Sequence, residues 1–366
     1  MARIIYGVAG EGFGHSSRSH VIGKRLITQG HDVMFLASRK SLRYLRRYFG
    51  DRVKQVFGLC IEYNNGDIDF LQTVRRNLKG LPRGYANNSA LFRNVVEPFA
   101  PDLVISDFEP FSAWWAWNHN VRSISIDHEH FLTMCRLDSP AAERKARFLA
   151  RAVTRCYHTG ADQYLILNFF NAPVIHPAAV LTPPVVRSVV EALKPSTGEH
   201  ILVYSTDLGN HMRSTMLDCL TRFGRQRFHI YGFDREETIH NCVFRSSSTG
   251  AFLSDLAGCR AVVATGGFSL ISEVLHFRKP MLLLPVQGQF EQMINAAYFE
   301  KLSLGRAARK LEVGVLGEFL DALNVPTSDH ADILWPNNRR VFDLLDETLS
   351  CLGLGGNTLP AGELRA

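Results

Sequence analysis

The chain opens with Arg3-Ile-Ile-Tyr-Gly-Val-Ala-Gly-Glu-Gly-Phe-Gly-His-Ser-Ser-Arg18, and its architecture follows from this stretch. The apolar run over residues 3–9 predicts a buried strand, and the glycines that follow predict a turn. Residues 18–29 have the pattern of a helix that Gly30 ends, and residues 31–37 predict the next strand. A strand, helix and strand in this order are typical of a doubly wound parallel sheet.

The second half of the chain opens in the same way. A strand is predicted over residues 200–205, after the linker Pro195-Ser-Thr-Gly198. Further short apolar runs alternate with helical patterns, over residues 102–107, 122–127, 163–167, 228–232, 260–264 and 281–285. We therefore expect an α/β protein of two Rossmann-like, doubly wound domains that face a cleft. The expected boundaries are 1–182 and 183–350, with a disordered tail over 351–366.

Length and composition agree with two globular domains. The chain has 366 residues, of which 46% are hydrophobic and 21% are charged. It has no apolar run of about 18 residues for a membrane span and no signal-peptide pattern at its start, so we expect a cytoplasmic protein. Its seven cysteines form no C-x-x-C pair, which predicts reduced thiols rather than disulfides or a zinc site.

The positive charge is concentrated in the first half. Residues 1–182 carry 23 Lys and Arg against 15 Asp and Glu, whereas residues 183–366 carry 18 against 20. The basic residues gather over 39–54 and 75–83, either as a solvated helix face or as a surface for an anionic partner. We expect peripheral contact with an anionic membrane surface, at its inner face, and no nucleic-acid partner, because no nucleic-acid-binding module accompanies the charge.

Polar residues follow two of the predicted strands in the first half. They are Asp107, Glu109, Asp127, His128, Glu129 and His130. Because the carboxyl ends of parallel strands border the ligand crevice, we expect these side chains near one cleft, although one or more of them can simply cap a helix.

The second half contains the stretch Ala264-Thr-Gly-Gly-Phe-Ser-Leu-Ile-Ser-Glu273, followed by a strand and Val286-Gln-Gly-Gln-Phe-Glu-Gln-Met-Ile-Asn295. Two glycines before a helix let a ligand approach the backbone, and the N–H groups of the first helical turn favour an anion such as a diphosphate. Glu273 is placed to accept hydrogen bonds from a ribose diol. The alternative is a tight turn whose helix is capped by Ser269.

The whole pattern resembles the donor-binding signature of GT-B glycosyltransferases, a superfamily that includes the UDP-glycosyltransferases and the peptidoglycan N-acetylglucosaminyltransferase. The resemblance implies that Gly266 and Gly267 bind the diphosphate of a nucleotide sugar and that Glu273 holds its ribose. It places sugar contacts in the segment with Gln287, Glu291 and Gln292. Plant-type members have His before the glycine pair, where this chain has Thr265.

Other residues join the donor site only through this resemblance. Phe252 and Leu253 would flank the base, and Ser205 would touch the phosphates, although an aromatic and a serine at such places often serve the core and a helix cap. The N-terminal loop that ends in Gly14 and His15 would lie opposite the donor. Together with residues 101–110, this loop resembles a bacterial and archaeal branch of the superfamily, so the likeness spans about residues 1–310. The G-x-G-x-G spacing of the loop does not satisfy a dinucleotide fingerprint.

The chemistry of sugar transfer suggests a role for His15. A base must take the proton of the acceptor hydroxyl, and an imidazole suits that task near neutral pH. His15 could instead hold the loop or touch the diphosphate, and Asp107, Glu109 and Glu129 are alternative bases or ligands of the acceptor hydroxyl. We expect no metal, because the helix start after Gly267 can stabilise the leaving diphosphate. We interpret Asp67-Ile-Asp69, which imitates a metal-binding D-x-D, as a solvated loop.

The sequence thus predicts a glycosyltransferase that moves a sugar from a nucleotide-sugar donor, UDP-linked, to an anionic or lipid-linked acceptor. Inversion and metal independence are implied by the resemblance. A nucleotide-sugar epimerase of the non-hydrolysing type and a non-catalytic nucleotide-sugar-binding subunit remain as alternatives. The epimerase group has Asp-Ser-Gly-Gly where this chain has Ala264-Thr-Gly-Gly267.

Overall fold

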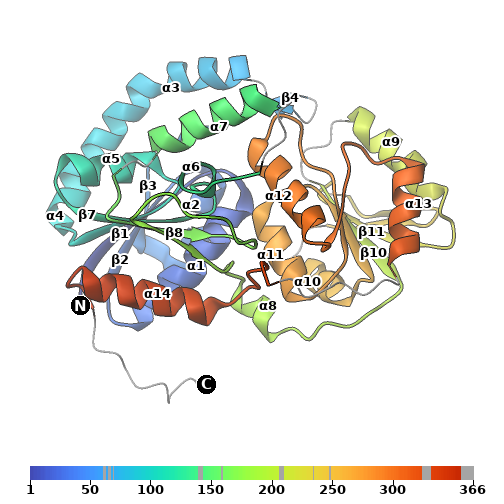
Figure 1. Cartoon of the computed structure of the whole chain (residues 1–366). Helices are drawn as coiled ribbons and strands as arrows, with labels where there is room; N and C mark the ends of the chain where they lie inside the picture. The colour runs from blue at the N-terminus through green and yellow to red at the C-terminus, as the bar shows by residue number, and fades with distance from the viewer. Residues whose placement is uncertain are drawn as a thin grey trace.

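The computed structural model describes residues 1–60, 63–64, 67–68, 70–138, 143–157, 160–205, 210–233, 235–246, 249–323 and 331–355. Two α/β units lie next to each other (Figure 1), each built on a seven-stranded sheet. Among the described helices, none is long and apolar enough to cross a membrane.

The first sheet has the strand order β3-β2-β1-β6-β7-β8-β9, and all of its strand pairs are parallel. Its strands are β1 (Arg3–Val8), β2 (Asp32–Ala37), β3 (Val53–Gln55), β6 (Leu103–Asp107), β7 (Arg122–Asp127), β8 (Gln163–Leu167) and β9 (Ala179–Thr182). The helices around it are α1 (Gly12–Thr28), α2 (Arg39–Phe49), α3 (Phe70–Leu91), α4 (Glu97–Phe99), α5 (Pro110–Asn118), α6 (Phe131–Met134) and α7 (Arg144–Tyr157). A short 3-10 helix, η1 (Gly50–Arg52), a π-helical turn, η2 (Phe92–Val96), and the hairpin β4 (Tyr63–Asn64) and β5 (Asp67–Ile68) complete the unit.

The second sheet has the order β12-β13-β11-β10-β14-β15-β16, and only the β12–β13 pair in it is antiparallel. Its strands are β10 (His200–Tyr204), β11 (Arg227–Tyr231), β12 (Glu237–Ile239), β13 (Cys242–Phe244), β14 (Ala261–Ala264), β15 (Met281–Leu283) and β16 (Gly305–Ala307). Its helices are α9 (Asn210–Thr221), α10 (Thr249–Gly258), α11 (Phe268–His276), α12 (Phe290–Lys301) and α13 (Val313–Ala322).

Both sheets are covered on their two faces, so their strands are apolar along almost their whole length. In β1 five of the six residues are buried, and all four residues of β14 are buried. The predicted strands are present in both halves, whereas the edge strands β3, β9, β12 and β16, and β13 next to β12, were not predicted. Those strands are three or four residues long, too short for a periodic pattern to stand out.

The chain crosses between the two units at two places. The first crossing follows β9 and leads through α8 (Ser188–Ala192) to β10. The second brings α14 (Asn338–Cys351) back to the first unit, where Asp346 accepts hydrogen bonds from Arg25 and Gln29 of α1. Residues 338–350 were expected to belong to the second domain, 183–350. In the structure they pack on the first unit instead. Of the tail, residues 351–355 continue from α14, and residues 356–366 lie outside the described residues.

All seven cysteines are free thiols, five of them buried. Burial raises the pKa of the Cys135, Cys242 and Cys259 thiols to about 12, 11 and 12, so these side chains act as small apolar groups of the core.

Candidate active site

Three of the predicted residues meet at the carboxyl ends of the first sheet. His15 lies in the first turn of α1, Asp107 is the last residue of β6, and Glu129 follows β7. The Nδ1 atom of His15 is 2.7 Å from Asp107 Oδ1, and its Nε2 atom is 3.4 Å from Glu129 Oε1. The Asp107 side chain is fully buried, whereas those of His15 and Glu129 are 15% and 14% exposed. A carboxylate thus stands at each nitrogen of a slightly exposed imidazole.

The glycine-rich turn explains how His15 reaches this place. The structure begins α1 at Gly12, whose φ is +72°, so Gly14 and His15 belong to the first helical turn instead of a loop before the helix. β1 pairs with β6 so that Val8 stands opposite Asp107, and the Ala9 N–H donates to the Asp107 carbonyl. The start of α1 is therefore fixed directly beside the end of β6.

Arg18 is a member of this cluster that the sequence analysis missed. Its Nε donates to Asp107 Oδ2 at 2.7 Å, and its Nη2 donates to Asp107 Oδ1 at 2.5 Å and to Glu129 Oε2 at 3.4 Å. Ser19 adds a hydroxyl donor to Asp107 Oδ2 at 2.9 Å. The signal was present, since Arg18 follows His15 by three residues and therefore shares its helix face.

The charges of the cluster set its pKa values. Burial disfavours the charged form of Asp107, but Arg18 and His15 outweigh burial and hold the pKa of its carboxyl below the usual range. Burial and Arg18 oppose protonation of His15, yet Glu129 and Asp107 together raise the pKa of its imidazole. Asp107 is therefore a fixed anion, and His15 is poised to take up a proton.

Two groups among the described residues have the composition of a metal site. In the group His15, Asp107 and Glu129, the Arg18 guanidinium already stands among the ligand atoms. In the group His200, His229 and Asp255, the two imidazole rings are stacked with centroids 4.1 Å apart and an interplanar angle of 17°. Nearly parallel rings at this distance cannot aim their nitrogen lone pairs at one ion.

The other polar residues after the strands serve the fold. Glu109 accepts from the N–H groups of Phe111 and Ser112 and so caps α5, as was expected of at least one residue in this set. Asp127 accepts from the backbone and the Nδ1 of His130, both of which are buried. Both carboxylates are thus occupied by partners next to them in the chain.

On the second sheet, the predicted glycine turn leads into α11. Gly267 is the N-cap of this helix, and since it has no side chain it leaves the first-turn N–H groups without a side-chain cap; Ser269 lies inside the helix and does not fill that role. Gln292 holds the turn, because its Oε1 accepts from the N–H groups of Gly266 and Val286, each at 3.1 Å. Helix α11 therefore begins at a braced turn, with first-turn N–H groups that no side chain caps.

The starts of α1 and α11 approach each other closely. A Cβ atom added to Gly14 would lie 2.4 Å from the Ser269 Oγ, so a larger residue here would require the Ser269 hydroxyl to move. His128 joins the units nearby: its ring stacks on that of Phe268 at 3.8 Å, and its Nε2 is 3.0 Å from Asn295 Oδ1. The Asn295 Nδ2 in turn donates to the Gly266 carbonyl. The His15 cluster and the glycine turn are thus parts of one site.

Glu291 faces the His15 cluster from the second unit. Its Oε1 accepts from Asn295 Nδ2 at 3.2 Å and lies 3.7 Å from His128 Nε2. Burial, together with the nearby negative charge of Glu129, raises the pKa of the Glu291 carboxyl. A carboxyl group that resists ionisation can donate a hydrogen bond as well as accept one.

Glu273 has a partner that the sequence did not indicate. Arg187, the N-cap residue of α8 within the first crossing, donates through Nε to Oε1 at 2.7 Å and through Nη2 to Oε2 at 2.9 Å. The pair is mostly buried, and each oxygen of Glu273 retains a lone pair for a further donor.

The remaining predicted donor residues vary in placement. Phe252 of α10 is partly buried and packs edge-on against Tyr231, whereas the neighbouring Leu253 is 1% exposed and belongs to the core. Ser205 follows β10 and is buried, and its Oγ has no hydrogen-bond partner among the described residues. Thr265 follows β14, and Gln287 donates to the Pro285 carbonyl at 3.3 Å. The side chains of Asp67 and Asp69 lie outside the described residues.

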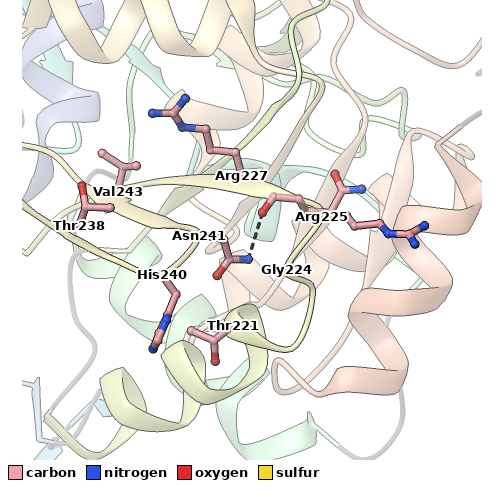
Figure 2. Close-up of a pocket in the computed structure, with 9 residues that line it drawn as sticks. Thr221, Gly224, Arg225, Arg227, Thr238, His240, Asn241 and Val243 are labelled. Carbon is pink, nitrogen blue, oxygen red and sulfur yellow. Dashed lines mark hydrogen bonds between the residues drawn. The ribbon is translucent and has the colours of Figure 1, made fainter.

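An open pocket of about 680 Å³ lies elsewhere on the second unit (Figure 2). Its lining comes from the end of α9, the start of β11 and the β12–β13 turn: Thr221, Gly224, Arg225, Gln226, Arg227, Thr238, His240, Asn241 and Val243. This is the amino end of β11, whereas His15 and Gly267 stand at carboxyl ends of strands. Since the ligand crevice of an open parallel sheet lies at its carboxyl ends, we do not assign the reaction to this pocket.

Comparison with known proteins agrees with this geometry. The profile of the family described as "Glycosyl transferase family 1" matches residues 2–324. An uncharacterized glycosyltransferase of Methanosarcina mazei is 24% identical over 327 residues, which cover 83% of this chain and 85% of that protein.

Two solved structures have the same two-domain fold. Phytolacca americana UGT2, complexed with UDP-2-fluoro-glucose and pterostilbene, aligns with a TM-score of 0.59 at 13% identity, over 88% of this chain and 89% of its own. MurG of Acinetobacter baumannii aligns with a TM-score of 0.57 at 13% identity, over 95% of this chain and 100% of its own. The two facing α/β units are therefore those of the GT-B fold, and the chain belongs to glycosyl transferase family 1.

Proposed function

We propose that this enzyme transfers a sugar from a UDP-linked donor to an acceptor hydroxyl with inversion at the anomeric carbon, and that His15 is the base. The observation that carries the proposal is the position of the His15 imidazole, held by Asp107 at Nδ1 and placed across from the start of α11. Of the two ring nitrogens, Nε2 is the one left to receive a proton.

The proposed step uses few groups. The acceptor hydroxyl gives its proton to His15 Nε2 while its oxygen forms a bond to the anomeric carbon. The bond between that carbon and the phosphate oxygen breaks, and the UDP leaves with the electron pair. Asp107 stabilises the resulting imidazolium, as a buried carboxylate does when it accepts from the other ring nitrogen.

The leaving diphosphate would lie at the N-terminus of α11. The N–H groups there have no side-chain cap, and they are held in place before the reaction because Gln292 braces the turn. Charge on the leaving group is thereby stabilised by the chain itself, which supports metal-independent transfer. The choice of UDP rests on the donor analogue in the Phytolacca complex.

Glu273 would hold the ribose of the donor, with Arg187 in place. A diol can donate to the free lone pairs of the two carboxylate oxygens while Arg187 fixes their orientation. Phe252 and Ser205 would lie near the base and the phosphates, and Glu291 near the sugar.

A thermal-shift series tests the donor site. UDP, GDP, dTDP and their sugar conjugates are added to the protein, because a ligand that binds only the folded state raises its melting temperature. The variant that tests the helix start is Gly267→Ala. An added Cβ meets nothing within 4 Å and the φ of −67° suits alanine, so the fold should tolerate the change. The methyl group would occupy space beside the helix start, where the diphosphate is proposed to bind. Gly314→Ala on α13 also meets nothing within 4 Å and is the matched control.

We expect UDP and its conjugates to stabilise the wild type and the control, and to stabilise Gly267→Ala much less. Equal stabilisation of all three proteins would show that the diphosphate does not bind at the start of α11. Incubation with donor alone separates the reactions: an epimerase converts the donor, whereas a transferase needs an acceptor for turnover.

We further propose that the protein works in the cytoplasm, at the inner face of an anionic membrane, and that the acceptor is lipid-linked or anionic. The support comes from α3 and α7, which together carry nine Lys and Arg and no Asp or Glu. Several of their apolar side chains are exposed to solvent: Leu71, Val74, Leu78, Leu81, Tyr85, Phe148 and Val153. Both helices pack around α5, since Phe57 lies between α3 and Phe111, and Trp114 donates to the Cys156 carbonyl. Basic residues beside exposed apolar ones fit a bilayer with anionic lipids.

The basic residues of α2 behave differently. Helix α2 buries Leu42 and Leu45 and exposes its arginines, as a solvated surface helix does. Co-sedimentation with vesicles tests the distinction. We expect binding to vesicles that contain phosphatidylglycerol, weaker binding to pure phosphatidylcholine, and loss of binding in Leu78→Ser/Phe148→Ser. The control is Arg43→Ser/Arg46→Ser on α2, which should retain most binding. If this control loses binding and Leu78→Ser/Phe148→Ser retains it, the membrane contact lies on α2.

A further inference from the structure

The His15 cluster contains more charge than a histidine and carboxylate pair requires. Asp107 and Glu129 flank the two ring nitrogens of His15, and Arg18 bridges both carboxylates from the next turn of the same helix. Glu291 approaches from α12, and Phe108 stacks on the imidazole at 6.3 Å. These are the groups that face His15 from α1, β6, the segment after β7 and α12.

Asp107 Oδ1 and Arg18 Nη2 each lie 2.7 Å from His15 Nδ1, and the same Nη2 donates to Asp107 Oδ1 at 2.5 Å. We assign the proton to Nδ1, because the Asp107 carboxylate is the anion on this side of the ring and stabilises an N–H that points at it. Nε2 is then the basic nitrogen and faces Glu129.

The charges explain why Arg18 is needed. With His15 neutral, Asp107, Glu129 and Arg18 sum to a charge of minus one, and a proton on His15 brings the group to zero. Without Arg18 the two carboxylates would leave minus two beside the imidazole, which would then keep its proton at neutral pH. A base that is already protonated cannot accept the proton of an acceptor hydroxyl.

We propose that Arg18 is a positioning residue of the transfer reaction, which sets the basicity of His15 by holding and partly neutralising Asp107 and Glu129. This inference rests on the proposed role of His15 as the base. The Arg18 side chain is only 5% exposed, so it acts through the two carboxylates and His15.

The test titrates His15 by NMR in the free protein, with the His15 signal assigned from a His15→Asn variant. Arg18→Met should move the titration of His15 to higher pH by roughly one to two units, and Glu129→Gln should move it to lower pH. The double variant Arg18→Met/Glu129→Gln keeps the sum at minus one and should titrate near the wild type. Arg25→Met, which removes an ion pair with Asp346 on the same helix, is the control that should not move it.

Transfer kinetics give the second readout. In Arg18→Met the acidic limb of the kcat/KM profile should move to higher pH with the NMR titration, while KM for the donor changes little. Arg18→Lys keeps the charge and should keep the limb, with a lower kcat because the bidentate geometry is lost. If Arg18→Met does not fold, Arg18→Gln, which removes the charge but keeps a hydrogen-bond donor, is the test variant and should shift the limb in the same direction.

A purely structural Arg18 would lower the melting temperature and leave both pH profiles where they are, and that result would overturn the proposal. So would a double variant that titrates no closer to the wild type than Arg18→Met does. Because the NMR titration needs no substrate, it decides the effect of Arg18 on His15 even if the wild type shows no transfer, which would count against the proposed function instead.

Discussion

The two glycine-rich turns of this molecule both follow the carboxyl end of a parallel strand, β1 in the first sheet and β14 in the second, yet they present different chemistry. The turn before α1 presents side chains, His15 and Arg18, which are tied to carboxylates from neighbouring strands. The turn before α11 presents backbone, a helix start whose N-cap is glycine and whose shape is held by Gln292. The difference teaches that one architecture can present side chains at one strand end and backbone N–H groups at another, according to the residues on the turn.

The largest effect is expected from Asp107→Asn, which changes the site beside the first turn and leaves the second turn intact. The amide no longer fixes the Nδ1–H form of His15 and leaves the buried Arg18 without its charge partner, so kcat should fall by about 10³- to 10⁴-fold. Thermal shifts with UDP should remain, because α11 is untouched. Asp102→Asn, at the exposed start of the same segment, is the control. If UDP binding were lost along with kcat, the first turn would be needed for donor binding as well as for catalysis.

The next effect joins the two turns. Gly14→Ala places a methyl group against Ser269 and should push the α1 and α11 starts apart, with a loss of about 10²-fold in kcat/KM. Since the clash is with the Ser269 Oγ, the second change Ser269→Ala should restore part of the rate. Gly14→Ala with unchanged kinetics would show that the close approach is not used in catalysis.

A smaller effect is expected at the ribose contact. Arg187→Met frees Glu273 from its partner, and the donor KM should rise by about tenfold because the carboxylate loses its fixed orientation, with little change in kcat. Initial rates at varied donor concentration measure both constants. A lower KM would instead mean that Arg187 competes with the ribose.

The smallest effect concerns stability. The pKa of Glu291 is raised in the folded protein, so folding loses stability as pH rises above the unfolded value of 4.5. Glu291→Gln removes this cost, and its melting temperature should exceed that of the wild type by a few degrees at pH 8 and by less at pH 5. Glu318→Gln, at an exposed ion pair, should show no such pH-dependent gain. A gain of equal size at both pH values would contradict the shift.

The sequence predicted the parts of the fold that depend on local pattern. Buried parallel strands are apolar along their length, so β1, β7 and β8 could be placed to within a residue or two, and polar residues after β6 and β7 marked the site. Asp107 and Glu129 were expected near one cleft because strand ends converge, and His15 was suggested as the base by the chemistry of sugar transfer.

The partners across long sequence distances could not be predicted in this way. Arg187 reaches Glu273 over 86 residues, and Arg18 reaches Asp107 over 89, and neither separation leaves a periodic signal. The same holds for α14, whose amphipathic pattern predicts a helix but not the sheet against which it packs. In each case tertiary contact, rather than local propensity, decides the outcome.

The return of α14 to the first unit has a consequence for how the molecule can be cut. Asn338 exchanges two hydrogen bonds with the backbone of Val186, and residues 332–337 contact the ends of β8 and β9, so two crossing segments run side by side. A protease cut at residues 195–198 would therefore break only one of the two segments that connect the units. The two fragments should stay associated under native conditions and separate only in denaturant, and co-expressed halves split there should reassemble as an enzyme.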